Sequence, residues 1–177
     1  MKDQISVLIP EEKVCERIRE IAAQIDRDFA GEQVHLIGIL KGSVFFICEL
    51  AKRLTIPVTI DFMQVSSYGD GTKSSGVVRI SKDTDEGLVG KNTIVVEDII
   101  DSGRTLSYLL KLLKERKPKS LKLCTLLDKP SRRVVDVDVD YVGFQIPDEF
   151  VVGFGLDYAQ KYRNLPYIGV VKPGGEE

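Results

Sequence analysis

Residues 93–106 read TIVVEDIIDSGRTL, and this segment passes from an apolar run through two acids and a small-residue turn into a helical pattern. The apolar run before Glu97 is short, β-branched and continuous, which is typical of a strand covered on both faces in a parallel sheet. Leucines at 106, 109, 110 and 113 then recur at helical spacing. The segment therefore predicts a strand, a loop and a helix, with the turn at 101–103 lying at the helix N-terminus.

The turn at 101–103 has the chemistry of an anion site. Unpaired backbone N–H groups and the helix dipole attract a phosphate there, and the hydroxyls of Ser102 and Thr105 could add hydrogen bonds. Glu97 and Asp98 would repel a phosphate unless a sugar diol or a Mg²⁺ ion lies between them and the ligand. The alternative is that Asp101 or Ser102 merely caps the helix and that the two preceding acids are solvated.

Residues 95–106 resemble the ribose-phosphate signature of the phosphoribosyltransferases that use 5-phosphoribosyl-1-diphosphate, and EDIIDSG at 97–103 resembles their hypoxanthine-guanine branch. The resemblance covers nearly the whole chain in family order. It continues through LKG at 40–42, SSYG at 66–69, LDKP at 127–130, IPDEFVVG at 146–153, LDY at 156–158 and Arg163.

This resemblance implies contacts with the sugar and the diphosphate. The family's diphosphate contacts fall on Lys41, Gly42, Ser67, Tyr68 and Arg163. Its ribose-phosphate contacts fall on Glu97, Asp98, Asp101, Ser102, Gly103, Arg104 and Thr105. Arg104 is given only a backbone role, because relatives carry varied residues at that position. Asp101 is carried over as the catalytic residue, the general base or proton partner of a purine ring nitrogen.

The resemblance also implies a purine site and a metal site. Its purine contacts fall on Lys129, Phe150, Val151 and Asp157, and its Mg²⁺ contacts on Glu97, Asp98 and Asp157. These roles are physically reasonable, because an aromatic face suits a flat base and an ammonium group donates to the 6-oxo oxygen. A guanidinium fork such as that of Arg163 suits a phosphate.

The rest of the chain predicts an α/β fold. Helices are expected at 10–30 and 43–53, and strands at 34–40, 58–62, 77–80 and 121–127. The strict alternation of Val and Asp at 135–140 predicts an edge strand or a half-exposed strand with its aspartates in water rather than on a metal. We expect a mostly parallel twisted sheet with helices on both faces, the type I phosphoribosyltransferase fold, and a small irregular hood from the terminal segments, in one domain over 1–177.

Two other features have structural alternatives. The Gly- and Ser-rich stretch at 66–76 predicts a mobile lid over the reaction centre, or else a floppy hairpin tip. His35, the only histidine, lies mid-strand without a catalytic partner in the pattern and is expected to be structural.

Composition narrows the function classes. The chain has 177 residues, 43% hydrophobic and 29% charged, with a net charge of −2, so no basic field recruits nucleic acid or an acidic membrane. The sequence shows no signal region and no apolar run that could span a bilayer. Three widely spaced cysteines fit reduced thiols better than disulfides. These features favour a cytoplasmic protein.

The resemblance implies a purine-salvage enzyme. Its reaction would be Mg²⁺-dependent transfer of 5-phosphoribosyl from the 1-diphosphate to hypoxanthine or guanine, giving IMP or GMP and diphosphate. Mg²⁺, Lys41 and Arg163 would stabilise the leaving group electrostatically. A homodimer or homotetramer is implied as well. Two alternatives are a non-catalytic regulator that binds nucleotide and RNA, which the near-neutral charge disfavours, and a transferase specialised for xanthine.

Overall fold

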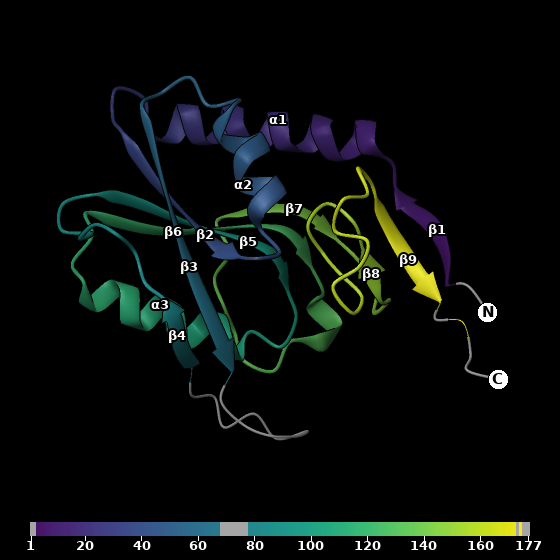
Figure 1. The fold of residues 1–177 in the computed structure, drawn as a ribbon. Helices are drawn as coiled ribbons and strands as arrows, with labels where there is room; N and C mark the ends of the chain where they lie inside the picture. Colours follow the sequence, from purple (N-terminus) through teal and green to yellow (C-terminus); the bar gives the residue numbers. More distant parts are fainter. Residues whose placement is uncertain (1–2, 68–77, 173, 175–177) are drawn as a thin grey trace.

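Six strands form the central sheet of the computed structural model, which describes residues 3–67, 78–172 and 174 (Figure 1). They are β2 (Val34–Leu40), β3 (Val58–Ser67), β4 (Val78–Lys82), β5 (Asn92–Ile100), β6 (Ser120–Asp128) and β7 (Tyr141–Gln145). Their spatial order is β4-β3-β2-β5-β6-β7, and every neighbouring pair is parallel except β3 with β4. The predicted mostly parallel sheet is confirmed.

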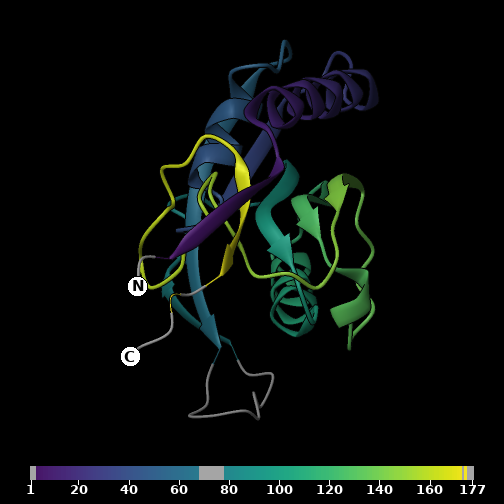
Figure 2. The same cartoon turned by 90° about the vertical axis from the view of Figure 1, so that its right-hand side faces the viewer.

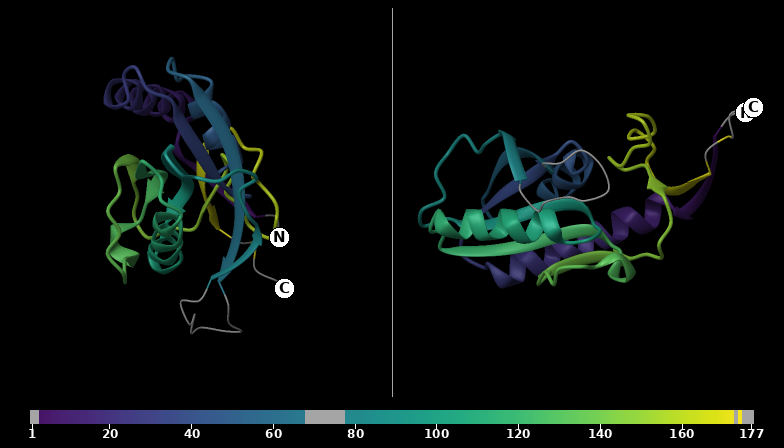
Figure 3. Two further views of the ribbon diagram at one scale, coloured as in Figure 1. Left: turned by 90° about the vertical axis from the view of Figure 1, so that its left-hand side faces the viewer. Right: turned by 90° about the horizontal axis from the view of Figure 1, so that it is seen from below.

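Helices cover both faces of this sheet. The helices α1 (Glu11–Asp28) and α2 (Val44–Ala51) lie on one face, and α3 (Arg104–Glu115) lies on the other (Figures 1 and 3). The core divides accordingly, since Ile94 and Val96 of β5 pack in the cluster of α1 and α2 while Val95 packs with Leu109 of α3. This two-sided burial explains why β5 is apolar without alternation.

The sheet changes its winding direction between β2 and β5. The chain passes from β2 through α2 to β3 on one side, and from β5 through α3 to β6 on the other. In open α/β sheets, ligands bind outside the carboxyl ends of the strands at such a switch point. Lys41, directly after β2, and the segment 97–105, at the end of β5, both lie at this edge.

A second, three-stranded antiparallel sheet forms the predicted hood. It joins β1 (Gln4–Ile9), β9 (Ile168–Lys172) and β8 (Val151–Val152) in the order β1-β9-β8. Segments from the two ends of the chain therefore lie side by side (Figure 2). The hood is more regular than predicted, because its ladder pairs residues far apart in the sequence.

The prediction of an edge strand at 135–140 is wrong. A short 3₁₀ helix at Pro130–Arg132 is followed by bends, and the strand begins only at Tyr141. The backbone here does not join the sheet. Instead, the N–H groups of Val134 and Val135 both donate to the Ser102 carbonyl. Val137 packs against the α3 core while Asp136 and Asp138 are exposed, so the alternation reflects burial without a ladder.

The other predicted elements agree with the structure at 34–40 and within a few residues elsewhere. Residues 157–160 form a loop in which Ala159 and Gln160 have positive φ. Among the described residues, no helix combines the length and apolar character needed to cross a bilayer.

Candidate active site

A cleft of about 320 Å³ opens at the carboxyl ends of β2 and β5. Its lining includes Gly42 and every predicted ribose-phosphate residue except Arg104. These residues are Glu97, Asp98, Asp101, Ser102, Gly103 and Thr105. The structure therefore brings together most of what the sequence predicts for the sugar phosphate.

The loop before α3 is shaped by Gly103. This residue has φ +81°, and a Cβ there would lie 2.5 Å from the Val135 carbonyl oxygen, so only glycine fits without strain. It is also the residue before the first helical position, where the Ser102 hydroxyl accepts a hydrogen bond from the Arg104 N–H at 3.4 Å. The capping alternative therefore holds in part, through Ser102, while the N–H groups of the next first-turn residues remain available to an anion.

Glu97 and Asp98 are half-buried acids that line the cleft. Burial raises the pKa of Glu97 well above its usual range, and the neighbouring Asp98 raises it further. Burial also raises the pKa of Asp98 to about 6, and Asp157 adds to this, while backbone N–H groups and Arg163 oppose it. A cation that entered the cleft would favour the ionised form of both carboxyls, so the two adjacent acids can serve as its ligands.

Gly42 fixes the distance between the β2 loop and Asp98. A Cβ on Gly42 would lie 2.5 Å from Asp98 Cγ and would overlap its carboxylate oxygen. On the other side, a Cβ on Gly155, which has φ +102°, would overlap the Gly42 carbonyl. Gly42 thus lies against the Asp98 side chain on one side and against the Gly155 backbone on the other, and both close approaches need a glycine.

Lys41 and Arg163, two of the predicted diphosphate residues, meet at Gln160. The ammonium of Lys41 and the guanidinium of Arg163 each donate to Gln160 Oε1 at 3.3 Å. Arg163 also pairs with Asp157 at 3.0 Å and donates to the Gly155 carbonyl at 2.7 Å. Of the other three, Gly42 packs against Asp98, Ser67 lies at the end of β3, and Tyr68 lies outside the described residues, as does most of the predicted lid at 66–76.

The predicted purine residues lie on two segments. Lys129 follows β6, is only 8% exposed, and has its ammonium 3.9 Å from a carboxylate oxygen of Asp148. Phe150 is 53% exposed, although its ring edge contacts Tyr158 at a centroid distance of 5.5 Å. Val151 begins β8 and is buried. An exposed aromatic ring and a lysine ammonium are suitable groups for a flat carbonyl-bearing base.

Asp101 lies in an ion-pair network that the sequence did not reveal. Arg132 donates to Asp101 Oδ1 at 3.0 Å, and its guanidinium is also 3.6 Å from Asp148. The next residue, Arg133, donates to the Asp101 backbone carbonyl at 3.2 Å and pairs with Asp128. The sequence shows only two arginines shortly after a strand end, and their partners cannot be identified without the fold.

The residues present suit a divalent cation without forming a complete cage. In the described part of the chain, no three His, Cys, Asp or Glu side chains converge as a ready metal site. Mg²⁺ does not need such a three-residue cluster, since it is typically held by one or two carboxylates with water and substrate phosphates. The half-buried acids Glu97 and Asp98 supply that donor chemistry, and Asp157 lies close enough to influence the pKa of Asp98.

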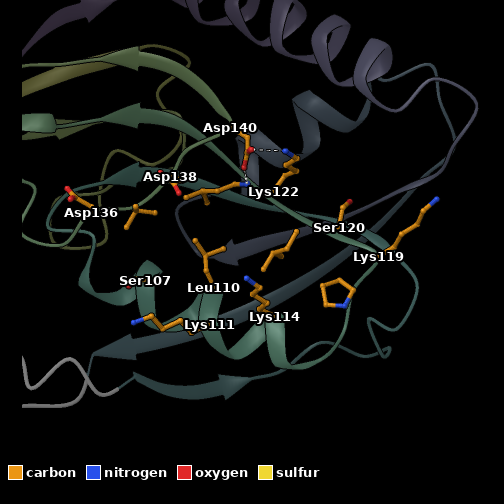
Figure 4. Close-up of a pocket in the computed structure, with 14 residues that line it drawn as sticks. Ser107, Leu110, Lys111, Lys114, Lys119, Ser120, Lys122, Asp136, Asp138 and Asp140 are labelled. Carbon is orange, nitrogen blue, oxygen red and sulfur yellow. Dashed lines mark hydrogen bonds and ion pairs between the residues drawn. The ribbon is translucent and has the colours of Figure 1, made fainter.

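A larger hollow of about 680 Å³ lies elsewhere, between α3 and residues 136–140 over the first half of β6 (Figure 4). Lys111 and Lys114 of α3 line it, and the ion pair of Lys122 with Asp140 closes one side. None of the predicted site residues lines this hollow. The chemistry predicted from the sequence therefore belongs to the smaller cleft.

Comparison with known proteins gives consistent matches. The family described as "Phosphoribosyl transferase domain" matches residues 9–159. The hypoxanthine phosphoribosyltransferase of Salmonella typhimurium is 52% identical over 173 residues, 97% of each chain. The hypoxanthine-guanine phosphoribosyltransferase of Bacillus subtilis is 51% identical over 98% of this chain and 97% of its own.

Other relatives differ in length. The bifunctional protein TilS/HprT of Listeria monocytogenes is 54% identical over 167 residues, but this chain spans only 26% of its length. A crystal structure of a hypoxanthine-guanine phosphoribosyltransferase from Bacillus anthracis superposes with a TM-score of 0.91 at 54% identity, covering 94% of this chain and 98% of that one.

Proposed function

The chain belongs to the phosphoribosyltransferase family, and from this premise we propose that it is a hypoxanthine-guanine phosphoribosyltransferase acting in purine salvage. It transfers 5-phosphoribosyl from its 1-diphosphate to hypoxanthine or guanine and releases diphosphate. One observation carries this proposal. Two acids of the segment 97–105 have separate neighbours: the Gly42 backbone packs against the Asp98 carboxylate, and Arg132 donates to Asp101 Oδ1.

We assign the part of the segment 97–105 around Asp98 to the diphosphate. Breaking the bond at the anomeric carbon places negative charge on the departing diphosphate, and fixed cations stabilise that charge. Lys41 and Arg163 already converge on one amide oxygen of Gln160. A neutral acceptor shared by two cations can be replaced by a diphosphate oxygen at little electrostatic cost.

Mg²⁺ would be held by Glu97 and Asp98, with Asp157 nearby, and would neutralise charge on the ribose diphosphate. The two acids also accept hydrogen bonds from the ribose hydroxyls. The loop 101–105 binds the 5′-phosphate through its backbone N–H groups and the hydroxyls of Ser102 and Thr105.

We assign the part of the segment 97–105 around Asp101 to the purine. Phe150 stacks on the base, the backbone of Val151 contacts its edge, and the Lys129 ammonium donates to the 6-oxo oxygen. Asp101 accepts the proton that leaves the ring nitrogen as the new glycosidic bond forms. Asp157 completes the wall between base and diphosphate.

Three further properties are proposed on the family relationship. The chain folds as one domain over 1–177, it works in the cytoplasm, and it assembles as a homodimer or homotetramer. The lid predicted at 66–76 falls mostly outside the described residues and stays a prediction.

Initial rates with hypoxanthine, guanine, xanthine and adenine, each with the diphosphate sugar and Mg²⁺, test this function. We expect turnover of hypoxanthine and guanine, weaker turnover of xanthine, and very little of adenine. A matched series with a chelator should show no turnover, and added Mg²⁺ should restore it. Undiminished rates in chelator would contradict the metal assignment, and a dominant rate with xanthine would support the xanthine-specific alternative.

A further inference from the structure

Arg132 contacts Asp101, the proposed proton acceptor, and this contact is not needed to hold the fold together. We propose that Arg132 is a positioning residue that orients the Asp101 carboxylate for proton transfer from the purine. This inference rests on the proposed function, because it gives Asp101 a proton to accept.

The geometry divides the two oxygens of Asp101 between two tasks. Arg132 Nε donates to Oδ1 at 3.0 Å, while no hydrogen bond reaches Oδ2 from the described residues. One oxygen is therefore held and the other stays open to a substrate N–H group. A general base whose orientation is set by a third group is a recurring arrangement in enzymes, because the base must reach the proton along a narrow direction.

Arg132 is itself held from the far side. Its guanidinium nitrogen lies 3.6 Å from Asp148, and the other carboxylate oxygen of Asp148 lies 3.9 Å from the Lys129 ammonium. Asp148 therefore connects the residue proposed to select the 6-oxo group with the arginine that holds the proton acceptor. The chain of contacts Lys129, Asp148, Arg132 and Asp101 links the two polar groups proposed to contact the purine.

The neighbouring arginine has a different role. The side chains of Arg133 and Asp128 are 15% and 10% exposed, and Arg133 supports the Asp101 backbone. By contrast, Arg132 and Asp101 are 53% and 48% exposed. A half-exposed ion pair contributes little to folding, whereas a buried pair is costly to break. The exposed pair is therefore better explained by orientation of the carboxylate than by stability.

A double-mutant cycle tests the inference on the full chain. Arg132→Gln should lower kcat for hypoxanthine about tenfold, a part of the whole general-base contribution, and should leave the KM for the diphosphate sugar unchanged. In an Asp101→Asn background, the same change should have no further effect on kcat, because there is no longer a base to orient. Arg132→Lys should recover part of the lost rate, since an ammonium can still hold Oδ1.

Arg116→Gln is the matched control. Arg116 pairs with Asp83 away from the cleft through two hydrogen bonds, with one guanidinium nitrogen 2.6 Å from a carboxylate oxygen. It should leave kcat unaltered, and both Gln variants should melt within about 4 °C of the parent protein.

The outcomes distinguish a failure of this inference from a failure of the proposed function. If Arg132→Gln lowers kcat equally in the parent and in Asp101→Asn, Arg132 does not act through Asp101 and the inference is wrong. Wild-type kcat in Arg132→Gln would also overturn it. If Asp101→Asn itself keeps full activity, the proton role in the proposed function fails first.

Discussion

Gly42→Ala should damage the diphosphate site through Asp98. The added Cβ would lie 2.5 Å from Asp98 Cγ. Non-bonded carbons normally approach to about 3.5–4.0 Å, so the two segments must separate by roughly 1 Å. The loop cannot easily retreat, because the Gly42 carbonyl is already packed against Gly155. The Asp98 carboxylate is therefore expected to move.

A 1 Å misplacement in an active site can cost about 10²-fold in rate, and overpacking typically costs about 1–3 kcal/mol of stability. We expect Gly42→Ala to lower kcat/KM for the diphosphate sugar by about 10² while the protein remains folded, because domains of this kind are stable by about 5–15 kcal/mol. Steady-state kinetics over a range of Mg²⁺ concentrations, with urea unfolding in parallel, measure both effects. The Mg²⁺ requirement should also rise.

Gly87→Ala is the matched control, because a Cβ at Gly87 meets nothing within 4 Å. It should leave both kinetics and stability within error of the parent. If Gly42→Ala behaves like Gly87→Ala in kcat/KM and in Mg²⁺ dependence, the close approach of Gly42 to Asp98 has no catalytic consequence and the reasoning is refuted.

Three further changes test other parts of the structure. Lys129→Ala should raise the KM for hypoxanthine and reduce the discrimination against adenine, since an ammonium donor disfavours the 6-amino group; unchanged discrimination in initial rates would remove Lys129 as the selector. Arg133→Gln should lower the urea-derived free energy of unfolding by about 3 kcal/mol, because it leaves Asp128 unpaired; a loss below about 1 kcal/mol would contradict this. Burial, and to a lesser extent the charge of Lys91, lowers the pKa of His35 below 6.5. The unfolded chain therefore binds more protons at His35 than the folded chain does, and the free energy of unfolding falls as the pH drops below about 6.5. His35→Gln should therefore flatten the stability profile between about pH 7 and about pH 5, and an identical slope in both proteins would refute the assignment.

The parts of the fold that follow from local pattern were predictable. The continuous apolar run at 34–40 became β2 with the same bounds, and the leucine spacing after Arg104 became α3. Both signals arise from burial, which leaves a period in the sequence. The alternation at 135–140 failed for the same reason, because a loop packed on one side alternates just as a strand does.

Contacts between distant segments left no comparable signal. Lys41 and Gln160 are 119 positions apart, and nothing in the sequence marks Gln160 as the acceptor shared with Arg163. Arg132 was missed similarly, since its partners Asp101 and Asp148 lie on different loops. The residues of the cleft were predictable because the strand–loop–helix motif places them locally; their supporting contacts depend on the tertiary structure.

The central claim is that Asp101 accepts the purine's proton while the 97–105 loop binds the diphosphate sugar. Rapid quenching after hypoxanthine is mixed with enzyme already saturated with the sugar and Mg²⁺ tests it most directly, alongside the dissociation constant of the sugar. Wild-type protein should form IMP and diphosphate in equal amounts. Asp101→Asn should bind the sugar with an unchanged dissociation constant but form IMP about 10² to 10⁴ times more slowly. A single-turnover rate within about threefold of wild type, well below that range, would contradict the account.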